Sequence, residues 1–391
     1  MKSKNIKLLF FIKFVGGLLF FLPVYALYLE QSLFSLTNVG FVLALESVCF
    51  SLFEIPTGAL SDIYGRKNVL IYAHVISLIA VLFLLKGGSL FIFALYAILK
   101  SFARSLVSGT DQALVYDTLL AENQEHKFSD ILGKLFAFWP IGASIASLVG
   151  SYLATFSLKH TIAWSLLPLA ISLILCFFLK EPKLHKPAKK QITLHISSAI
   201  KEVFKSKAIL LLLLMNAILY GVGEPIYNFT SIFFIERQIE IAEIGSLFTI
   251  AFGFAALGHY MSGTLIKKFS MKKLLFICLF LTPFIDLFST VTFGYIAGLL
   301  AMVPSFTYSI RNTIISSETN TLVTSNNRAT ILSISSAFQQ VVITLGTLFT
   351  GYVAEIFTIT QVFQLLLMVE LTVPILIALF YFKQKAKIPN S

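Results

Sequence analysis

The sequence has few charged residues. Asp, Glu, Lys and Arg make up 13% of its 391 residues, whereas a soluble domain has roughly 25%. Hydrophobic residues account for 57%. So little charge cannot cover a surface that faces water, and the composition therefore excludes a soluble enzyme, a soluble nucleic-acid-binding protein and a secreted disulfide-rich scaffold.

The sequence also has few cysteines and lacks a nucleotide-binding motif. The 3 cysteines all lie inside apolar runs, and their spacing matches neither a disulfide framework nor a metal site. The sequence has no Gly-x-x-x-x-Gly-Lys-Ser/Thr loop for ATP phosphates, and no nucleophile or acid pair at the spacing of a catalytic site. We therefore expect no enzyme activity, cofactor, metal or nucleic-acid partner.

Long apolar runs dominate what is present. Each has roughly 20 residues, enough for a helix to cross about 30 Å of hydrocarbon. The alternating segments of about 10 residues that form outer-membrane barrels are not found. Cutting the chain where charges, Pro, Gly and Asn gather gives twelve candidate helices. The prediction is an all-α polytopic membrane protein with twelve transmembrane helices.

The positive charges indicate the orientation. With a cytoplasmic amino terminus, 24 of the 30 Lys and Arg residues fall in inner segments, 3 in outer loops and 3 within spans. Inner loops of membrane proteins are enriched in Lys and Arg. We therefore expect a multi-pass protein of the plasma membrane (the inner membrane in bacteria), surrounded by lipid, with both termini in the cytoplasm.

The longest polar stretch, residues 181–207, divides the chain into halves of six spans, residues 1–180 and 208–391. Within it, residues 194–204 place Ile196, Ile200 and Phe204 on one helical face among lysines. That pattern fits an amphipathic helix on an anionic inner leaflet. A solvated linker is the alternative. In both cases the stretch is a domain boundary.

Short motifs recur between the halves. Pro23-Val24-Tyr25 is matched by Pro225-Ile226-Tyr227, and Tyr152-Leu153-Ala154 by Tyr352-Val353-Ala354; with three further matches in order, the offsets are 200 to 205 residues. This indicates two pseudo-symmetric six-helix bundles of the same orientation. Such a duplication suits a protein that moves one half against the other around a central site.

The loop after the second span carries the most specific motif. It reads Gly-Ala-Leu-Ser-Asp-Ile-Tyr-Gly-Arg-Lys, with Gly58, Asp62, Gly65, Arg66 and Lys67 at its key positions. This resembles the signature loop of the major facilitator superfamily, and the topology resembles that family over the whole chain. The resemblance implies the major facilitator fold, secondary transport and a cytoplasmic latch.

In that latch Asp62 and Arg66 pair with each other or with the next helix. The glycines allow close packing or a turn with positive φ. The family adds an acidic residue at the inner end of the fourth helix, and Asp117 fits by position. The alternative is that Arg66 and Lys67 only set the orientation.

Several charged residues fall inside the spans. Each costs about 3 kcal/mol near the bilayer centre, so it needs a partner or a function. The resemblance implies that helices one, four, seven and ten line the cavity, which favours functional roles there and leaves Asp286 and Glu370 at the periphery with local hydrogen bonds. The candidates for proton coupling or substrate binding are Glu46, Glu54, Lys100, Arg104 and Glu224.

Two of these candidates lie at similar depths. Glu54 is about fifteen residues along its inward-running helix and Arg104 about fourteen along its own. They could form an ion pair. Arg104 also resembles an arginine that the family associates with proton movement, so pairing and coupling are both open.

Glu224 is the predicted proton or cation site. It precedes Pro225 near the middle of the seventh span. Proline removes a backbone hydrogen bond beside this carboxylate, and desolvation favours the neutral form of a carboxyl group. The alternative is an acid held by a neighbouring lysine or hydroxyl.

The repeat also predicts a gate. At an offset of 200, Asp111 corresponds to Arg311, so equivalent positions carry opposite charges. We expect an ion pair between them that closes the cytoplasmic side and breaks in the inward-facing state. The alternative is that each residue pairs within its own half, Asp111 with Arg104 for example.

The sequence favours a monomeric transporter that exports a small amphipathic or drug-like compound in exchange for protons, resembling the family's bacterial drug-efflux members. Acidic residues in the expected cavity and 39 phenylalanines support this reading. One alternative is a proton symporter for a nutrient or metabolite. Another is a membrane receptor that kept the transporter fold without transport.

Overall fold

The computed structural model describes most of the chain as helix. No strand occurs among the described residues, and ten helical segments are long and apolar enough to cross a membrane. The predicted all-α membrane protein is therefore confirmed. Backbone positions are described for residues 4–182, 203, 206–323 and 328–386, and within these ranges the side chains of residues 55, 58, 59, 62, 129 and 328–330 are not described.

The chain forms two compact units, which divide helix α11 between them. The first consists of Met1–Ala188 and Ile241–Thr249, the second of Lys189–Glu240 and Ile250–Ser391. The linker helix predicted for residues 194–204 lies outside the described residues, apart from Val203.

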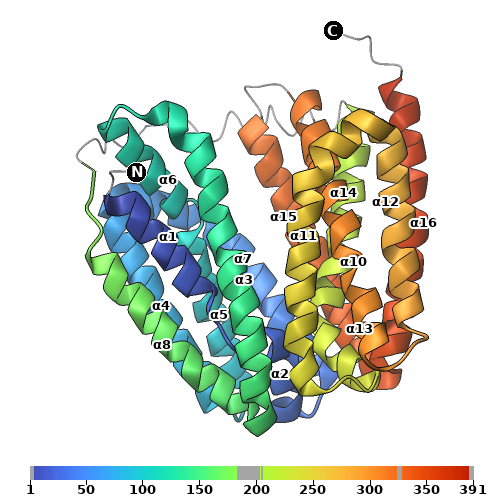
Figure 1. Cartoon of the computed structure of the whole chain (residues 1–391), viewed down its shortest axis with the longest axis horizontal. Helices are drawn as coiled ribbons and strands as arrows, with labels where there is room; N and C mark the ends of the chain where they lie inside the picture. Colours follow the sequence, from blue (N-terminus) through green and yellow to red (C-terminus); the bar gives the residue numbers. More distant parts are fainter. Residues whose placement is uncertain (1–3, 183–202, 204–205, 324–327, 387–391) are drawn as a thin grey trace. The chain divides into compact units, whose positions relative to one another are not determined.

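The first unit contains the helices drawn from blue to green in Figure 1. They are α1 (Lys4–Gly17), the 3₁₀ turn η1 (Leu22–Val24), α2 (Tyr25–Leu33), α3 (Leu36–Tyr64), α4 (Arg66–Lys86), α5 (Leu90–Val107), α6 (Thr110–Ala121), the 3₁₀ turn η2 (Glu125–Lys127), α7 (Phe128–Phe156) and α8 (Leu158–Phe177).

The second unit contains the rest. Its helices are α10 (Lys207–Glu236), most of α11 (Ile241–Phe269), α12 (Met271–Ser289), α13 (Gly294–Met302), α14 (Ser305–Leu322), α15 (Arg328–Ile356) and α16 (Ile359–Lys385).

Ser and Thr side chains cap the amino termini of several helices. The first N–H groups of a helix have no partner inside it, and a Ser or Thr oxygen can accept one of them. Ser35 Oγ accepts from Asn38 N at the start of α3, at 3.2 Å. Thr358 and Gln361 form a reciprocal capping box at the start of α16. The carboxylate of Glu236 adds to this second site, accepting from Ile359 N at 2.9 Å and Thr360 N at 3.0 Å.

Three predicted spans each consist of two helical segments. The first is α1 and α2 with η1 between them, the fourth is α5 and α6, and the tenth is α13 and α14. The fourth span breaks at Gly109, which has φ +77°, a conformation that glycine adopts without a steric penalty. The tenth breaks before Pro304, whose ring nitrogen has no hydrogen to donate.

The repeated prolines have different effects. Pro23 lies in the 3₁₀ turn that interrupts the first span, whereas Pro225 lies inside the continuous helix α10. A proline inside a helix frees the carbonyl four residues earlier, here that of Gly221. Gly346 of α15 packs against this carbonyl so closely that an added Cβ would be 2.2 Å from the oxygen. The second half therefore covers its released carbonyl with a glycine of the neighbouring helix.

Close glycine contacts also hold the first unit together. A Cβ on Gly142 of α7 would lie 2.2 Å from the carbonyl oxygen of Phe14, and one on Gly150 would lie 2.0 Å from that of Phe20. Gly142 and Gly150 therefore allow α7 to pack closely against the first span. Nearby, Ile6, Leu9 and Phe10 of α1 are buried in a core shared with α6, α7 and α8.

Candidate functional sites

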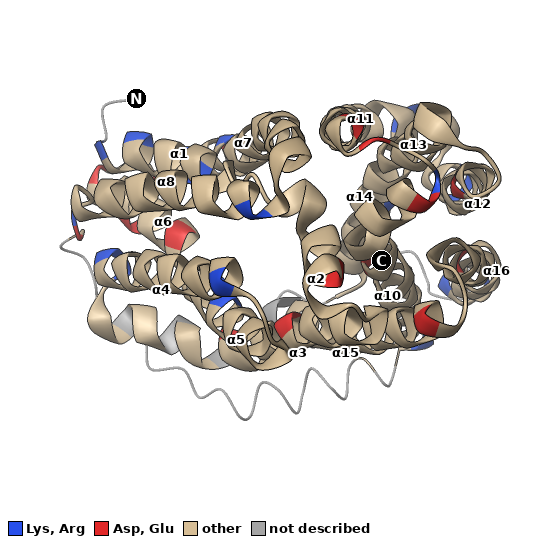
Figure 2. Ribbon diagram, turned by 90° about the horizontal axis from the view of Figure 1, so that it is seen from below, with Lys and Arg blue, Asp and Glu red and all other residues tan. Residues whose placement is uncertain are grey.

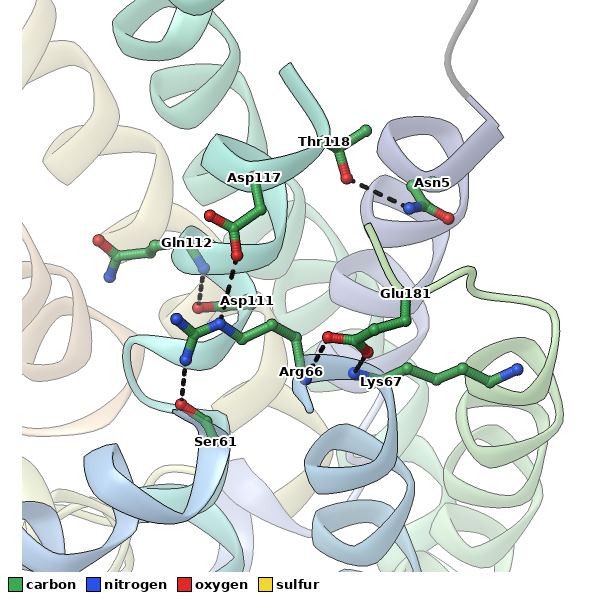
Figure 3. A network of polar contacts seen from close by, with 9 residues as sticks. All are labelled: Asn5, Ser61, Arg66, Lys67, Asp111, Gln112, Asp117, Thr118 and Glu181. Carbon is green, nitrogen blue, oxygen red and sulfur yellow. Dashed lines mark hydrogen bonds and ion pairs between the residues drawn. The ribbon is translucent and has the colours of Figure 1, made fainter. Parts of the chain in front are cut away.

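Charged residues are sparse along the helices, most of which are drawn tan in Figure 2. The motif between α3 and α4 holds one group of them. Gly65 joins the two helices with φ +85°, and the N–H groups of Arg66 and Lys67 both donate to the carboxylate of Glu181, at 2.8 Å each (Figure 3). Glu181 therefore caps the amino terminus of α4, where a negative charge is also favoured by the helix dipole.

Sequence reasoning missed Glu181, although it is an acidic residue directly after the sixth span. An added Cβ on Gly65 would lie 3.1 Å from its carboxyl carbon. The turn therefore requires glycine for its positive φ and for the approach of this side chain.

The side chain of Arg66 connects three helices. Its Nη1 donates to Ser61 Oγ at 2.5 Å, and its Nε lies 3.4 Å from Asp117 Oδ2 on α6 (Figure 3). Sequence reasoning named Asp117 for this position but not Ser61. Gly58 and Asp62 were named for the same latch, but the surroundings of Gly58 and the side chain of Asp62 are outside what the structure describes.

Further contacts of Lys67 and Asn5 fix this end of the first unit. Lys67 Nζ donates to the carbonyl of Phe177 at the end of α8, at 2.8 Å. The Asn5 side chain exchanges two hydrogen bonds with the backbone of Lys180, at 2.8 and 2.9 Å, and also donates to Thr118 Oγ1. The network joins α1, α4, α6 and α8 at the residue that precedes Glu181.

A second group of charged and polar residues lies in the same unit, on α2, α3 and α5. Lys100 Nζ lies 2.6 Å from Glu46 Oε2, and Tyr25 Oη donates to the other carboxylate oxygen at 2.6 Å. Ser101 Oγ donates to the backbone carbonyl of Glu46 at 2.8 Å. The lysine and glutamate side chains remain 29% and 17% exposed. This site combines an accessible ion pair with aromatic rings.

Glu54 and Arg104 do not form the ion pair that their positions in the sequence allow. Both side chains are exposed, and neither makes an ion pair with any residue that the structure describes. The guanidinium of Arg104 instead lies over the ring of Phe50, with its Cζ 4.4 Å from the ring centroid. Similar positions along the two helices therefore do not bring the two charges together.

The two predicted gate residues have other partners. Asp111 forms an ion pair with Lys13 of α1, and its Oδ1 accepts from the backbone N–H of Gln112 at 2.7 Å (Figure 3). Lys13 lies within α1, so this ion pair joins α1 to α6. Asp111 therefore has a partner within its own half, and that partner is Lys13 and not Arg104.

Arg311 pairs with Glu370. Its Nη1 lies 2.6 Å from Glu370 Oε1, and the two side chains are 0% and 4% exposed. The Tyr308 ring covers one side of the guanidinium, 5.1 Å away. Among the described residues, Nε and Nη2 of Arg311 have no hydrogen-bond partner. Glu370, which we had expected to make only a local contact at the periphery, is instead half of a buried ion pair.

Two other acidic residues of the second unit, Asp286 and the candidate Glu224, interact with groups around this pair. Asp286 of α12 is half-buried and interacts electrostatically with both Glu370 and Arg311. Glu224 is half-buried in α10 and interacts in the same way with Tyr220, Tyr227 and Tyr308. No cluster of three or more His, Cys, Asp or Glu side chains suited to a metal occurs in the described parts of the chain.

Comparisons with solved structures show transporters of the same fold. The nucleoside transporter NupG is 16% identical with a TM-score of 0.78, covering 98% of this chain and 99% of NupG. A bacterial homologue of the human lysosomal transporter Spinster is 15% identical with a TM-score of 0.73, covering 98% of each chain. A D-xylose–proton symporter is 14% identical with a TM-score of 0.71, covering 97% of this chain and 98% of the symporter.

Among curated protein sequences, none matches closely enough to identify a relative. The family model of the Major Facilitator Superfamily, however, matches residues 9–325. That match covers more than half of the chain and includes the motif around Gly65 and Arg66. The chain therefore belongs to the major facilitator superfamily of secondary transporters.

Proposed function

We propose that this transporter exports a small amphipathic compound in exchange for protons, by alternating access in the plasma membrane. The observation that carries the proposal is the ion pair between Glu46 and Lys100, which is enclosed by apolar helices yet partly exposed. A carboxylate in such a place can exchange its cationic partner for a proton or for a substrate group. Competition between proton and substrate for one carboxylate produces exchange.

Glu224 is the proposed second proton site. It lies half-buried in α10 beside Pro225 and within electrostatic reach of three tyrosines. A tyrosine hydroxyl can donate a hydrogen bond to a carboxylate and can accept one from a carboxylic acid. A carboxyl group whose charged and neutral forms both find hydrogen-bond partners can bind and release a proton during a transport cycle.

The contacts around Arg66 are the proposed cytoplasmic latch. The guanidinium joins Ser61 on α3 to Asp117 on α6, while Glu181 caps α4. A latch of this kind stabilises one arrangement of the helices relative to another, so its loss shifts the balance between states. Asp111, whose local partner is Lys13, and Arg311, whose local partner is Glu370, would have to exchange partners to form the predicted gate.

Proteoliposomes that contain a pH-sensitive dye test the proposal. We expect a panel of amphipathic compounds, applied on one side, to include members that drive protons in the opposite direction. Glu46→Gln and Glu224→Gln should abolish this coupled flux. The matched control is Asp130→Asn, which neutralises an exposed carboxylate paired with Lys134 and should leave the flux intact.

The direction of the proton movement separates the alternatives. Proton flux in the same direction as substrate indicates a symporter, the activity named for the D-xylose–proton symporter of the same fold. Substrate binding without any flux of substrate or protons indicates a receptor. Either result would refute exchange.

A further inference from the structure

Aromatic rings and a carboxylate surround the ammonium group of Lys100. Its Nζ lies 4.7 Å from the centroid of the Tyr25 ring and 5.4 Å from that of Tyr96, and 2.6 Å from Glu46 Oε2. The two rings meet edge to face, with centroids 5.8 Å apart. We call Glu46, Tyr25 and Tyr96 the cation cage.

We infer that the cation cage is a binding site for an organic cation and that Lys100 occupies it when no ligand is bound. The inference names the substrate class for the site proposed above and in that respect rests on the proposed function. The chemistry that recognises the lysine ammonium is equally suited to an ammonium group on a small molecule. Lys100 is thus a tethered competitor of the ligand.

The cage is built for a positive charge. Ring faces within about 6 Å attract ammonium groups, and aromatic cages recognise quaternary ammonium ligands in this way. Tyr25 donates to Glu46 Oε1 at 2.6 Å, which leaves Oε2 to face the cation. Both tyrosines are buried, at 8% and 1% exposure, so the rings are fixed by packing before a ligand arrives.

Lys100 can leave the cage, unlike the arginine of the second unit. Its side chain has a flexible four-carbon stem and is 29% exposed, whereas Arg311 is completely buried. With Lys100 in place the cage and its occupant are neutral, and they remain neutral when a ligand cation replaces it. Both cations together would leave one excess positive charge, so binding requires displacement.

The first test measures equilibrium binding to the purified full-length protein in detergent by calorimetry. The probe is benzyltrimethylammonium, with benzyl alcohol as its neutral counterpart. If Lys100 occupies the cage about 90% of the time, Lys100→Met should tighten binding of the cation about tenfold and leave the alcohol unchanged. The control is Lys134→Met, which removes an equal charge from an exposed pair on α7 and should change neither.

Variants of the cage test whether the tighter binding arises there. In the Lys100→Met background, Glu46→Gln should remove the tenfold gain in affinity for the cation. Tyr96→Phe keeps the ring and should retain it, whereas Tyr96→Leu should weaken binding about fivefold, as expected for losing one cation–π contact of about 1 kcal/mol. A gain that survives Glu46→Gln would overturn the assignment, as would a gain that the alcohol shares.

A second measurement uses the unmodified protein and so does not depend on how a variant folds. Acetic anhydride labelling of Lys100, read by mass spectrometry, should rise when benzyltrimethylammonium displaces the side chain into water, while labelling of Lys134 stays constant. Unchanged or reduced labelling of Lys100 would refute displacement. Neither measurement requires a gradient, so failure of proton exchange in liposomes would leave these results standing, and the reverse also holds.

Discussion

The buried pair of Arg311 and Glu370 allows a quantitative prediction. Glu370→Gln keeps the shape of the side chain but leaves the guanidinium without its carboxylate, at a site where the arginine is 0% exposed and Nε and Nη2 already lack partners among the described residues. Removing one member of a buried ion pair costs about 3 to 5 kcal/mol. We expect this loss in the free energy of unfolding.

The assay follows thermal unfolding in detergent with a thiol-reactive fluorophore. Cys49, Cys176 and Cys278 are all buried and free, so they react only when the protein opens. The double variant Arg311→Met, Glu370→Leu should recover most of the stability, because apolar side chains replace a buried ion pair at little cost. Asp130→Asn, at an exposed pair, should unfold like the original protein.

Asp286 provides an internal check on this reasoning. It interacts electrostatically with Arg311 and could accept the guanidinium after Glu370→Gln. In that case Asp286→Asn should be more destabilising in the Glu370→Gln background than alone. Unfolding of Glu370→Gln at the original temperature, with or without Asp286→Asn, would refute a role of the ion pair in stability. The same holds if the double variant Arg311→Met, Glu370→Leu is no more stable than Glu370→Gln.

Three further predictions concern other contacts. Gly346→Ala should separate α15 from α10, because its Cβ would meet the carbonyl of Gly221 at 2.2 Å, and should lower the unfolding temperature; Gly263→Ala, with nothing within 4 Å, should not. Glu181→Gln should weaken the cap of α4 by about 1 kcal/mol, seen as faster proteolysis near the motif and not near α16. Glu224→Gln should remove the dependence of transport on the proton gradient between pH 6 and 8, and unchanged coupling would refute its assignment as a proton site.

The membrane fold could be predicted from the sequence because it depends on composition along the chain. Apolar runs and the distribution of Lys and Arg are one-dimensional signals, and they do not require knowledge of which helix faces meet. The break at Gly109 has a local signal as well. The repeated prolines do not: Pro23 and Pro225 look equivalent in the sequence, yet α10 continues through Pro225, where Gly346 packs against the Gly221 carbonyl.

The partners of the buried charges could not be predicted in the same way. Depth along a helix follows from counting residues, which placed Glu54 and Arg104 at one level. Rotation of each helix about its axis decides whether side chains at one level face each other, and Arg104 faces Phe50 instead. The partner of Lys13 has the same origin, because only the packing of α1 against α6 brings its ammonium group to Asp111.

The cap at Glu181 also bears on the order in which the chain is synthesised. The turn at Gly65 emerges from the ribosome long before Glu181, which follows α8, so α4 has no carboxylate at its amino terminus until the first six spans have been made. In the second half the order is reversed, because Glu236 is already present when the backbone of Ile359 and Thr360 arrives. The cap of α4 is thus completed by a residue that follows the first six spans, whereas α16 forms when its acceptor, Glu236, has already been synthesised.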